Sequence, residues 1–173
     1  MKKLTLAALL AAAPLAAFAA PPAAAPAPAT KPAAAAPAKP DPLVPVHQFL
    51  DTFNSGDMKA QYDAYAPGSV TLIDEFPPHV WTGPKASVIW PQDYDKHAKA
   101  FAVTDPKVVY SAPIVATTSG SVGYVVIPVT YSYKSHGTQM SEEASMTFAL
   151  TLTKAGYKIR AWSYNGIVPH TVK

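Results

Sequence analysis

The sequence predicts an α+β domain, in which a cone-shaped, curved antiparallel sheet packs on three N-terminal helices and encloses a central pocket. Two observations favour this class. Apolar residues between positions 43 and 101 mostly recur at helical spacing, whereas the segments after Asp105 alternate apolar and polar residues as strands do. Helices grouped ahead of hairpin-connected strands are typical of α+β domains. Because sheets twist, such a sheet should curve, and helices closing it would leave a hollow suited to a small ligand.

Two helices are expected at the start of the domain. The first has apolar residues at i, i+3, i+4 and i+7, namely Val46, Phe49, Leu50 and Phe53. It should end at Asn54-Ser55-Gly56. Asp57 is suited to cap the second helix, which should end before Pro67-Gly68 and whose apolar side comprises Met58, Tyr62 and Tyr65.

A short strand and a third helix should follow. One face of the strand comprises Val70, Leu72, Asp74 and Phe76, and Pro77-Pro78 terminates it. Thr82-Gly83-Pro84 is a helix start, and Pro91 should break or kink this helix before Asp93 restarts it. The apolar side of the restarted helix comprises Tyr94, His97, Ala98 and Phe101.

Four strands complete the domain, and turn residues separate them. We expect them at residues 107–116, 121–134, 144–152 and 157–164. The third shows the cleanest alternation, with every second residue from Ala144 to Leu152 apolar and directed to one face.

Residues 1–19 have the three parts of a secretory signal peptide: a basic start, an apolar run, and the small-x-small site Ala17-Phe18-Ala19. Cleavage before Ala20 would make the protein periplasmic or secreted, with no membrane span remaining. Residues 20–42 contain eleven Ala and eight Pro, which excludes a helix and provides too little bulky apolar surface for a core. They predict an extended linker ahead of the domain at residues 43–173.

Charge and composition exclude several classes of function. Four of the 14 basic residues and one of the 11 acidic residues precede Leu43, so the domain balances ten against ten. Its basic residues form no stripe, and we therefore expect no nucleic-acid partner. The chain has no cysteine, which excludes disulfides and thiolate chemistry. Motifs for nucleotide, calcium and serine-hydrolase sites are missing, and no cofactor is expected.

The order and spacing of several segments resemble the nuclear transport factor two-like superfamily, in its SnoaL-like and ketosteroid-isomerase-like branch. The matching segments are 49–57, 70–74, 81–84 and the final strand with Ile159 and Trp162. More narrowly, Ile73-Asp74-Glu75-Phe76 with His79, Trp81 and Gly83 looks like secreted bacterial members without an assigned activity. The resemblance implies a cone-shaped barrel, a central pocket and frequent homodimers. It implies no single function, because the superfamily includes isomerases, cyclases, dehydratases, scaffolds and binders.

The resemblance also allows a test against steroid isomerisation. That reaction needs a carboxylate base and two acidic donors to the oxyanion. Asp74 falls within about one residue of the base position, but Phe49 stands where the first donor is expected and cannot donate. The second donor would lie near Phe148, in a strand with no acid between Ala144 and Thr153. These residues argue against steroid isomerisation by this mechanism.

Asp74 is the principal candidate for chemistry. It shares a face with Val70 and Leu72, and a carboxylate desolvated among apolar residues can act as a base near neutral pH. A strand-end aspartate bonded to a turn amide is the structural alternative. His79 is a candidate proton shuttle or a surface loop residue. Glu75 is expected to point the opposite way. No metal site is expected, because the histidines have no regular ligand spacing.

Aromatic residues are the candidate ligand contacts, with core packing as the alternative. The expected pocket comprises Tyr62, Asp74, His79, Trp81, Trp90, Tyr94, Tyr110 and Tyr131. Trp162 and Tyr164 are expected on the outer sheet face, where with Arg160 they would form a dimer surface. Three functions are open: a binding domain for a small apolar or aromatic ligand, an isomerase, dehydratase or cyclase with Asp74 as base, and a protein-interaction module.

Overall fold

The computed structural model describes residues 39–172, so the signal peptide, the linker up to residue 38 and Lys173 lie outside the described residues. Its helices are α1 (Leu43–Ser55), α2 (Met58–Asp63) and α3 (Ala86–Ala100). Its strands are β1 (Val70–Ile73), β2 (Val80–Gly83), β3 (Val103–Tyr110), β4 (Val115–Ser119), β5 (Val122–Ser135), β6 (Thr138–Thr153), β7 (Gly156–Gly166) and β8 (His170–Thr171). The α+β class and the three helices are therefore confirmed.

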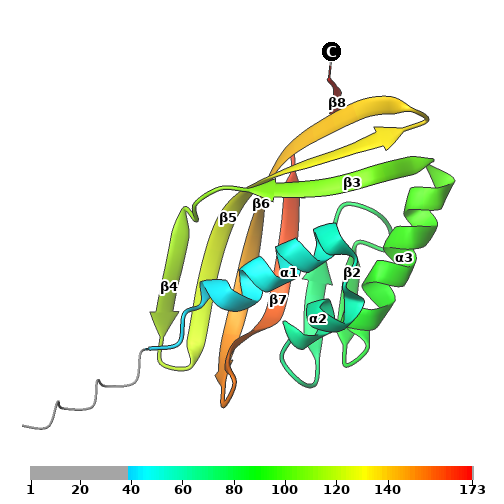
Figure 1. The fold of residues 1–173 in the computed structure, drawn as a ribbon. Coiled ribbons are helices and arrows are strands. Elements are labelled where there is room, and N and C mark those ends of the chain that lie inside the picture. The colour runs from blue at the N-terminus through cyan, green and yellow to red at the C-terminus, as the bar shows by residue number, and fades with distance from the viewer. Residues whose placement is uncertain (1–38, 173) are drawn as a thin grey trace, which may run out of the picture. The chain divides into compact units, whose positions relative to one another are not determined.

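The eight strands form one sheet in the order β2-β1-β7-β6-β5-β3, with β4 paired to β5 and β8 paired to β6. The sheet is mixed, not purely antiparallel as expected, because β1 runs parallel to β7. It curls over α1 and α3 without closing (Figure 1). The core lies between the helices and the sheet, and its fully buried side chains include Leu50, Leu72 and Phe148.

The first two helices form where the spacing and capping residues predict. Val46, Phe49 and Leu50 are buried on one face of α1. Gly56 ends the helix with φ 73°, a left-handed conformation that glycine adopts without steric cost. The Asp57 carboxylate then accepts a hydrogen bond from the Ala60 N–H at 3.0 Å and caps α2.

Three features of the chain differ from the sequence expectation. Val80–Gly83 forms β2, an edge strand that pairs with β1, so the third helix starts only at Ala86. The break expected at Pro91 is absent: the helix continues through this residue, where proline removes only the single hydrogen bond that its own N–H would have donated. The expected strand 107–116 is two strands, β3 and β4, which both pair with β5.

The predicted outer-face position of Trp162 and Tyr164 is wrong. Ala149 of β6 pairs with Ala161 of β7, and Leu150 pairs with Ile159. Arg160 therefore has no partner on β6, and it is exposed. This bulge inverts the inward and outward alternation that the final strand would otherwise keep. Trp162 is consequently 2% exposed, and Tyr164 lines the inner cavity.

Within residues 39–172, no helix combines the length and the apolar character that a membrane crossing requires.

Candidate functional site

A cavity of about 300 Å³ lies between α1, α3 and the inner face of the sheet. This volume is at the lower end of the range for ligand pockets, roughly 300–1,000 Å³. The walls combine aromatic rings with three carboxyl groups. The side chains that matter for its chemistry are Phe49, Phe53, Asp74, Glu75, Phe76, Trp90, Tyr94, His97, Phe101, Tyr131, Tyr133, Glu142, Trp162 and Tyr164.

Asp74 lies just past the end of β1, in the loop that returns the chain to β2. Its Oδ1 accepts a hydrogen bond from the Glu75 N–H at 2.7 Å, and its Oδ2 accepts one from the Trp90 indole N–H of α3 at 2.8 Å. Burial raises the pKa of Asp74 to about 6, and these hydrogen bonds oppose the shift. Asp74 is thus mostly ionised at neutral pH, and it becomes protonated at a pH of about 6.

Two further carboxyl groups, those of Glu142 and Glu75, lie together on the sheet side of the cavity. Glu142 comes from β6 and is 4% exposed, while Glu75 comes from the loop after β1. The Glu75 carboxylate accepts a hydrogen bond from the Gly166 N–H at 2.8 Å. A methyl group on Gly166 would overlap both Glu142 Oε1 and Glu75 Oε1, so the two oxygens converge on the space that a glycine leaves open.

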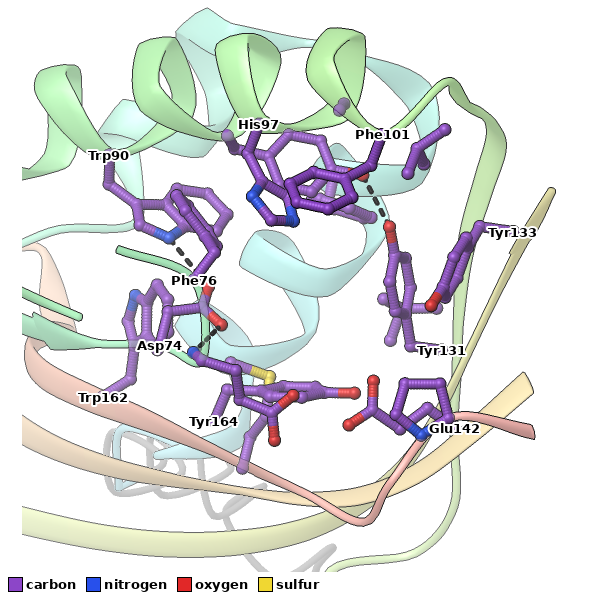
Figure 2. Close-up of a pocket in the computed structure, with 18 of the residues that line it drawn as sticks. Asp74, Phe76, Trp90, His97, Phe101, Tyr131, Tyr133, Glu142, Trp162 and Tyr164 are labelled. Atoms are coloured by element: carbon purple, nitrogen blue, oxygen red, sulfur yellow. Dashed lines mark hydrogen bonds between the residues drawn. The ribbon is translucent and has the colours of Figure 1, made fainter. Parts of the chain in front are cut away.

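The protonation of this pair follows from its geometry. Burial, and after it the neighbouring Glu75 carboxyl group, raises the pKa of Glu142 to about 8. Glu142 is buried, whereas Glu75 is exposed. Two carboxylates whose oxygens lie this close do not both ionise readily, so Glu142 keeps its proton at neutral pH. Figure 2 shows the Tyr164 hydroxyl facing Glu142. Neither Glu142 Oε1 nor the Tyr164 hydroxyl has a well-placed hydrogen-bond partner among residues 39–172.

Aromatic side chains form the remaining walls and hold one another in place. Trp90 and Trp162 meet edge to face with ring centroids 5.1 Å apart. Across the cavity, Tyr131 and Tyr133 of β5 stack at 4.8 Å, and the Tyr131 hydroxyl is hydrogen-bonded to that of Tyr94 at 2.7 Å (Figure 2). The rings are therefore fixed from α3 and from the sheet together.

Four of the residues expected in the pocket line the cavity: Asp74, Trp90, Tyr94 and Tyr131. The other four, Tyr62, His79, Trp81 and Tyr110, are not among its lining residues. Trp81 instead donates its indole N–H to Asp93 at 3.0 Å, and Tyr110 donates its hydroxyl to Asp51 at 3.0 Å. These bonds hold α3 against β2 and α1 against β3.

The proton shuttle expected at His79 lacks the necessary contact. The His79 ring lies 3.2 Å from the main-chain carbonyl of Asp74, measured from Nδ1, and the residue is exposed in the loop. The carboxylate of Asp74 instead points toward Trp90 (Figure 2). The nearest imidazole on the cavity wall belongs to His97 of α3, which the sequence had suggested only as part of an apolar helix side.

Sequence reasoning missed Glu75, Glu142 and Tyr164 as cavity residues. The sequence did contain a pattern that indicates Glu142. It lies two residues before Ala144, within β6, and so continues the alternation of Ala144, Met146 and Phe148 on the inner face. The stretch from Ala144 to Thr153 has no acid, but β6 begins earlier and brings Glu142 to the cavity. Glu75 gave no such signal, since β1 ends at Ile73 and the period of two ends with it.

This arrangement offers proton transfer and ion pairing. Within residues 39–172, no group of three or more His, Asp or Glu side chains has a geometry that could hold a metal ion. The cavity places a carboxylate that titrates near pH 6 and a carboxyl group that stays protonated to about pH 8 on one surface. These are the properties of a general base and a general acid, and equally of a receptor for hydrogen-bond donors.

Solved structures similar to this chain share its fold. A hexachlorocyclohexane dehydrochlorinase, LinA type 3, from Novosphingobium barchaimii covers 74% of this chain and 85% of its own, with a TM-score of 0.63 and 8% identity. A ketosteroid isomerase-like protein from Erwinia carotovora atroseptica covers 74% and 95%, with a TM-score of 0.57 and 15% identity. A nuclear transport factor 2-like protein from Salmonella enterica Typhimurium covers 72% of this chain and 87% of its own, with a TM-score of 0.59 and 10% identity.

No protein-family model and no curated protein sequence matches the chain. The likenesses to solved structures confirm the resemblance at the level of the fold: the domain has the nuclear transport factor 2-like fold, the cone-shaped α+β architecture expected from the sequence. Among the neighbours that share this fold are a dehydrochlorinase and an isomerase-like protein. At these identities the residues of the site have to be interpreted from this chain alone.

Proposed function

We propose that the protein binds a small molecule with an apolar or aromatic body in the cavity between α1, α3 and the sheet. The observation that carries the proposal is the cavity of about 300 Å³ whose walls are mostly aromatic and aliphatic side chains, fixed by their mutual packing. A preformed hollow of this kind stabilises an apolar ligand by removing its surface from water. The fold agrees with this, since its neighbours include proteins named for reactions of small organic molecules.

Native mass spectrometry of the protein, isolated gently from its own compartment, tests the proposal. A co-purified mass that is released on unfolding would support it and identify the ligand class. A protein that carries no such mass and binds none of a panel of small aromatic compounds would overturn it. The same spectrum measures the oligomeric state and so tests a second proposal, that the chain forms the homodimer frequent in this superfamily.

An enzymatic role is the second candidate, and the environment of Asp74 favours it. Asp74 faces the cavity, and burial raises its pKa to about 6, close to the value suited to a general base. The reaction class we propose for this case is proton abstraction, as in an isomerase, dehydratase or cyclase. Glu142, protonated at neutral pH, would then donate to the oxygen on which charge develops.

The substitution Asp74→Asn distinguishes the two candidates once a ligand is known. Its carbonyl oxygen can still accept from the Trp90 indole, while the titrating group and the second acceptor, for the Glu75 N–H, are lost. A binding protein should retain its affinity for a neutral ligand within a few-fold. An enzyme that uses this base should lose turnover by about 100-fold or more. The exposed neighbour Asp95 on α3 provides the matched control, and Asp95→Asn should change neither property.

We also propose that the protein is exported, on the basis of the N-terminal signal in residues 1–19. Sequencing the N-terminus of the mature protein tests this, with Ala20 as the expected first residue. A mature protein that retains Met1 would contradict it.

A further inference from the structure

The acidic groups of the cavity have no basic counterpart. Of the described residues that line it, three carry carboxyl groups, namely Asp74, Glu75 and Glu142, and none is Lys or Arg. His97 supplies the one imidazole, and burial lowers its pKa, so it is mostly neutral at pH 7. The lining therefore carries negative charge without a positive partner, which disfavours anions and favours a cation.

Glu142 provides a separate indication of a ligand. This residue is 4% exposed, and its Oε1 is buried without a well-placed hydrogen-bond partner. A buried polar atom in this situation costs free energy unless a donor reaches it. In the free protein, the proton held between Glu142 and Glu75 meets part of this need. A ligand ammonium group with several N–H donors could replace that proton and satisfy both carboxylates.

The aromatic walls suit the same kind of ligand. Trp90 and Trp162 lie beside Asp74, the Tyr164 hydroxyl faces Glu142, and the stacked Tyr131 and Tyr133 lie on the same side of the cavity as Glu142 (Figure 2). The faces of aromatic rings attract cations and at the same time accept an apolar body. A bare metal ion fits less well, because no group of three or more His, Asp or Glu side chains among residues 39–172 has a metal-holding geometry.

We propose that the ligand of this cavity is an organic cation, a protonated amine on a small apolar or aromatic body, with its ammonium group bound by Glu142 and Glu75 over Gly166. The inference rests on the proposed small-molecule function and specifies the ligand class. The ring system of the ligand would extend toward Trp90 and Trp162. There Asp74, from the loop after β1, would contribute a further negative charge.

Binding of such a ligand should be linked to pH. The titratable groups near Glu142 come from every element around it. The loop after β1 supplies Glu75 and Asp74, and β7 supplies Tyr164. Strand β5 supplies Tyr133 and Tyr131, the cross-strand partner of Glu142. His97 and Tyr94 of α3 line the cavity on its helical side. Burial raises the pKa of Glu142 to about 8 and that of the Tyr164 hydroxyl above its ordinary value. Glu142 is therefore the group that must lose its proton when the ammonium binds at pH 7.

Isothermal titration calorimetry of the full chain with three probes of one shape tests the inference. The probes are benzylammonium, benzyl alcohol and benzoate. We expect benzylammonium to bind about tenfold or more tightly than benzyl alcohol, and benzoate to bind most weakly. At pH 7, buffers of different ionisation enthalpy should reveal proton release on benzylammonium binding, and its affinity should increase from pH 6 to pH 8.

Two outcomes would overturn the inference in distinguishable ways. If benzyl alcohol or benzoate binds as tightly as benzylammonium, the cavity binds small molecules but has no preference for cations, and the proposed function survives. If none of the three binds, the inference fails, and the native mass spectrum decides whether the proposed function fails with it.

A pair of neighbouring substitutions separates a binding role of Glu142 from a structural one. Glu142→Gln should weaken benzylammonium about tenfold, abolish the proton release, and leave benzyl alcohol unchanged. Glu143→Gln alters the next residue, which is exposed and directed away from the cavity, and should change none of these quantities. Circular dichroism and thermal melting verify that both variants fold. A folded Glu142→Gln variant with unchanged amine affinity and proton release would contradict the inference.

Discussion

Gly166 shows how a single residue can shape the site from the backbone. Its N–H donates to Glu75, and the space beside its Cα is occupied by carboxyl oxygens of Glu75 and Glu142. Any side chain there would compete with those oxygens for the same volume. The absence of a Cβ, and not an unusual backbone angle, is what the position requires, in contrast to Gly56 with its φ of 73°.

We expect Gly166→Ala to displace both carboxyl groups. Because these are the ends of flexible side chains, the cost in stability should be modest, about 1 kcal/mol, while the affinity for benzylammonium should decrease several-fold. Urea denaturation and calorimetry measure the two effects. In the background Glu142→Ala, which removes one of the overlapping groups, the added cost of Gly166→Ala in stability should be smaller. Equal costs in both backgrounds would show that the methyl group does not meet Glu142.

At the scale of elements, the cavity depends on how α1 is joined to the sheet. The Asn54 side chain near the end of α1 pairs with the main chain of Val108 in β3, donating to its carbonyl and accepting from its N–H, both at 2.8 Å. One amide thus imitates a strand neighbour for an edge strand. This contact positions Phe53 and Val108, which both line the cavity, from opposite elements.

Asn54→Ala should therefore destabilise the domain by about 1–2 kcal/mol, because it leaves two main-chain groups of β3 without their partner. Urea denaturation measures the change. Ser55→Ala, at the next and equally exposed position, is the control and should cost a few tenths of a kcal/mol. If the two variants are equally stable, the Asn54 bridge does not hold β3 to α1.

At the scale of the whole molecule, the buried acids link stability to pH. Asp74 and Glu142 have pKa values of about 6 and about 8, above the ordinary values of 3.8 and 4.5 expected in the unfolded chain. The folded state thus binds more protons than the unfolded state between these limits. The contribution of both groups to stability is fully present below about pH 4 and is lost as the pH rises through their folded pKa values.

We expect the substitutions to flatten this dependence in separate windows. Asp74→Asn should remove a decrease of about 2–3 kcal/mol that wild type shows mainly between pH 4 and pH 6. Glu142→Gln should remove the decrease between about pH 5 and pH 8, so the variant gains on wild type as the pH rises. Urea unfolding across this range measures both. Glu143→Gln loses only an exposed contact with His170 at 3.7 Å and should stay within a few tenths of a kcal/mol of the wild-type curve. A Glu142→Gln curve parallel to wild type would contradict the assignment.

Much of the local structure was predictable, because it depends on neighbours in the chain. The buried face of α1, the Asp57 cap and the alternation along β6 follow from residue spacing and short-range hydrogen bonds. Asp74, which the alternation of β1 grouped with Leu72, also faces the cavity, although it lies one residue past the end of the strand. These relations hold wherever the helix or strand is regular. They predicted the fold class, and half of the residues expected in the pocket do line the cavity.

The remainder was decided by contacts between segments far apart in the sequence. The bulge at Arg160 exists only against β6, and it turns Trp162 and Tyr164 inward. Trp81 faces Asp93 instead of the cavity because β2 pairs with β1 beside α3. The site itself is of this kind: Glu75, Glu142 and Gly166 come from three separate segments. The sequence by itself determined the fold class and most of the helices and strands, except where strand pairing created β2 and divided β3 from β4. The tertiary structure decided which acids meet, since their convergence depends on strand pairing that no local period encodes.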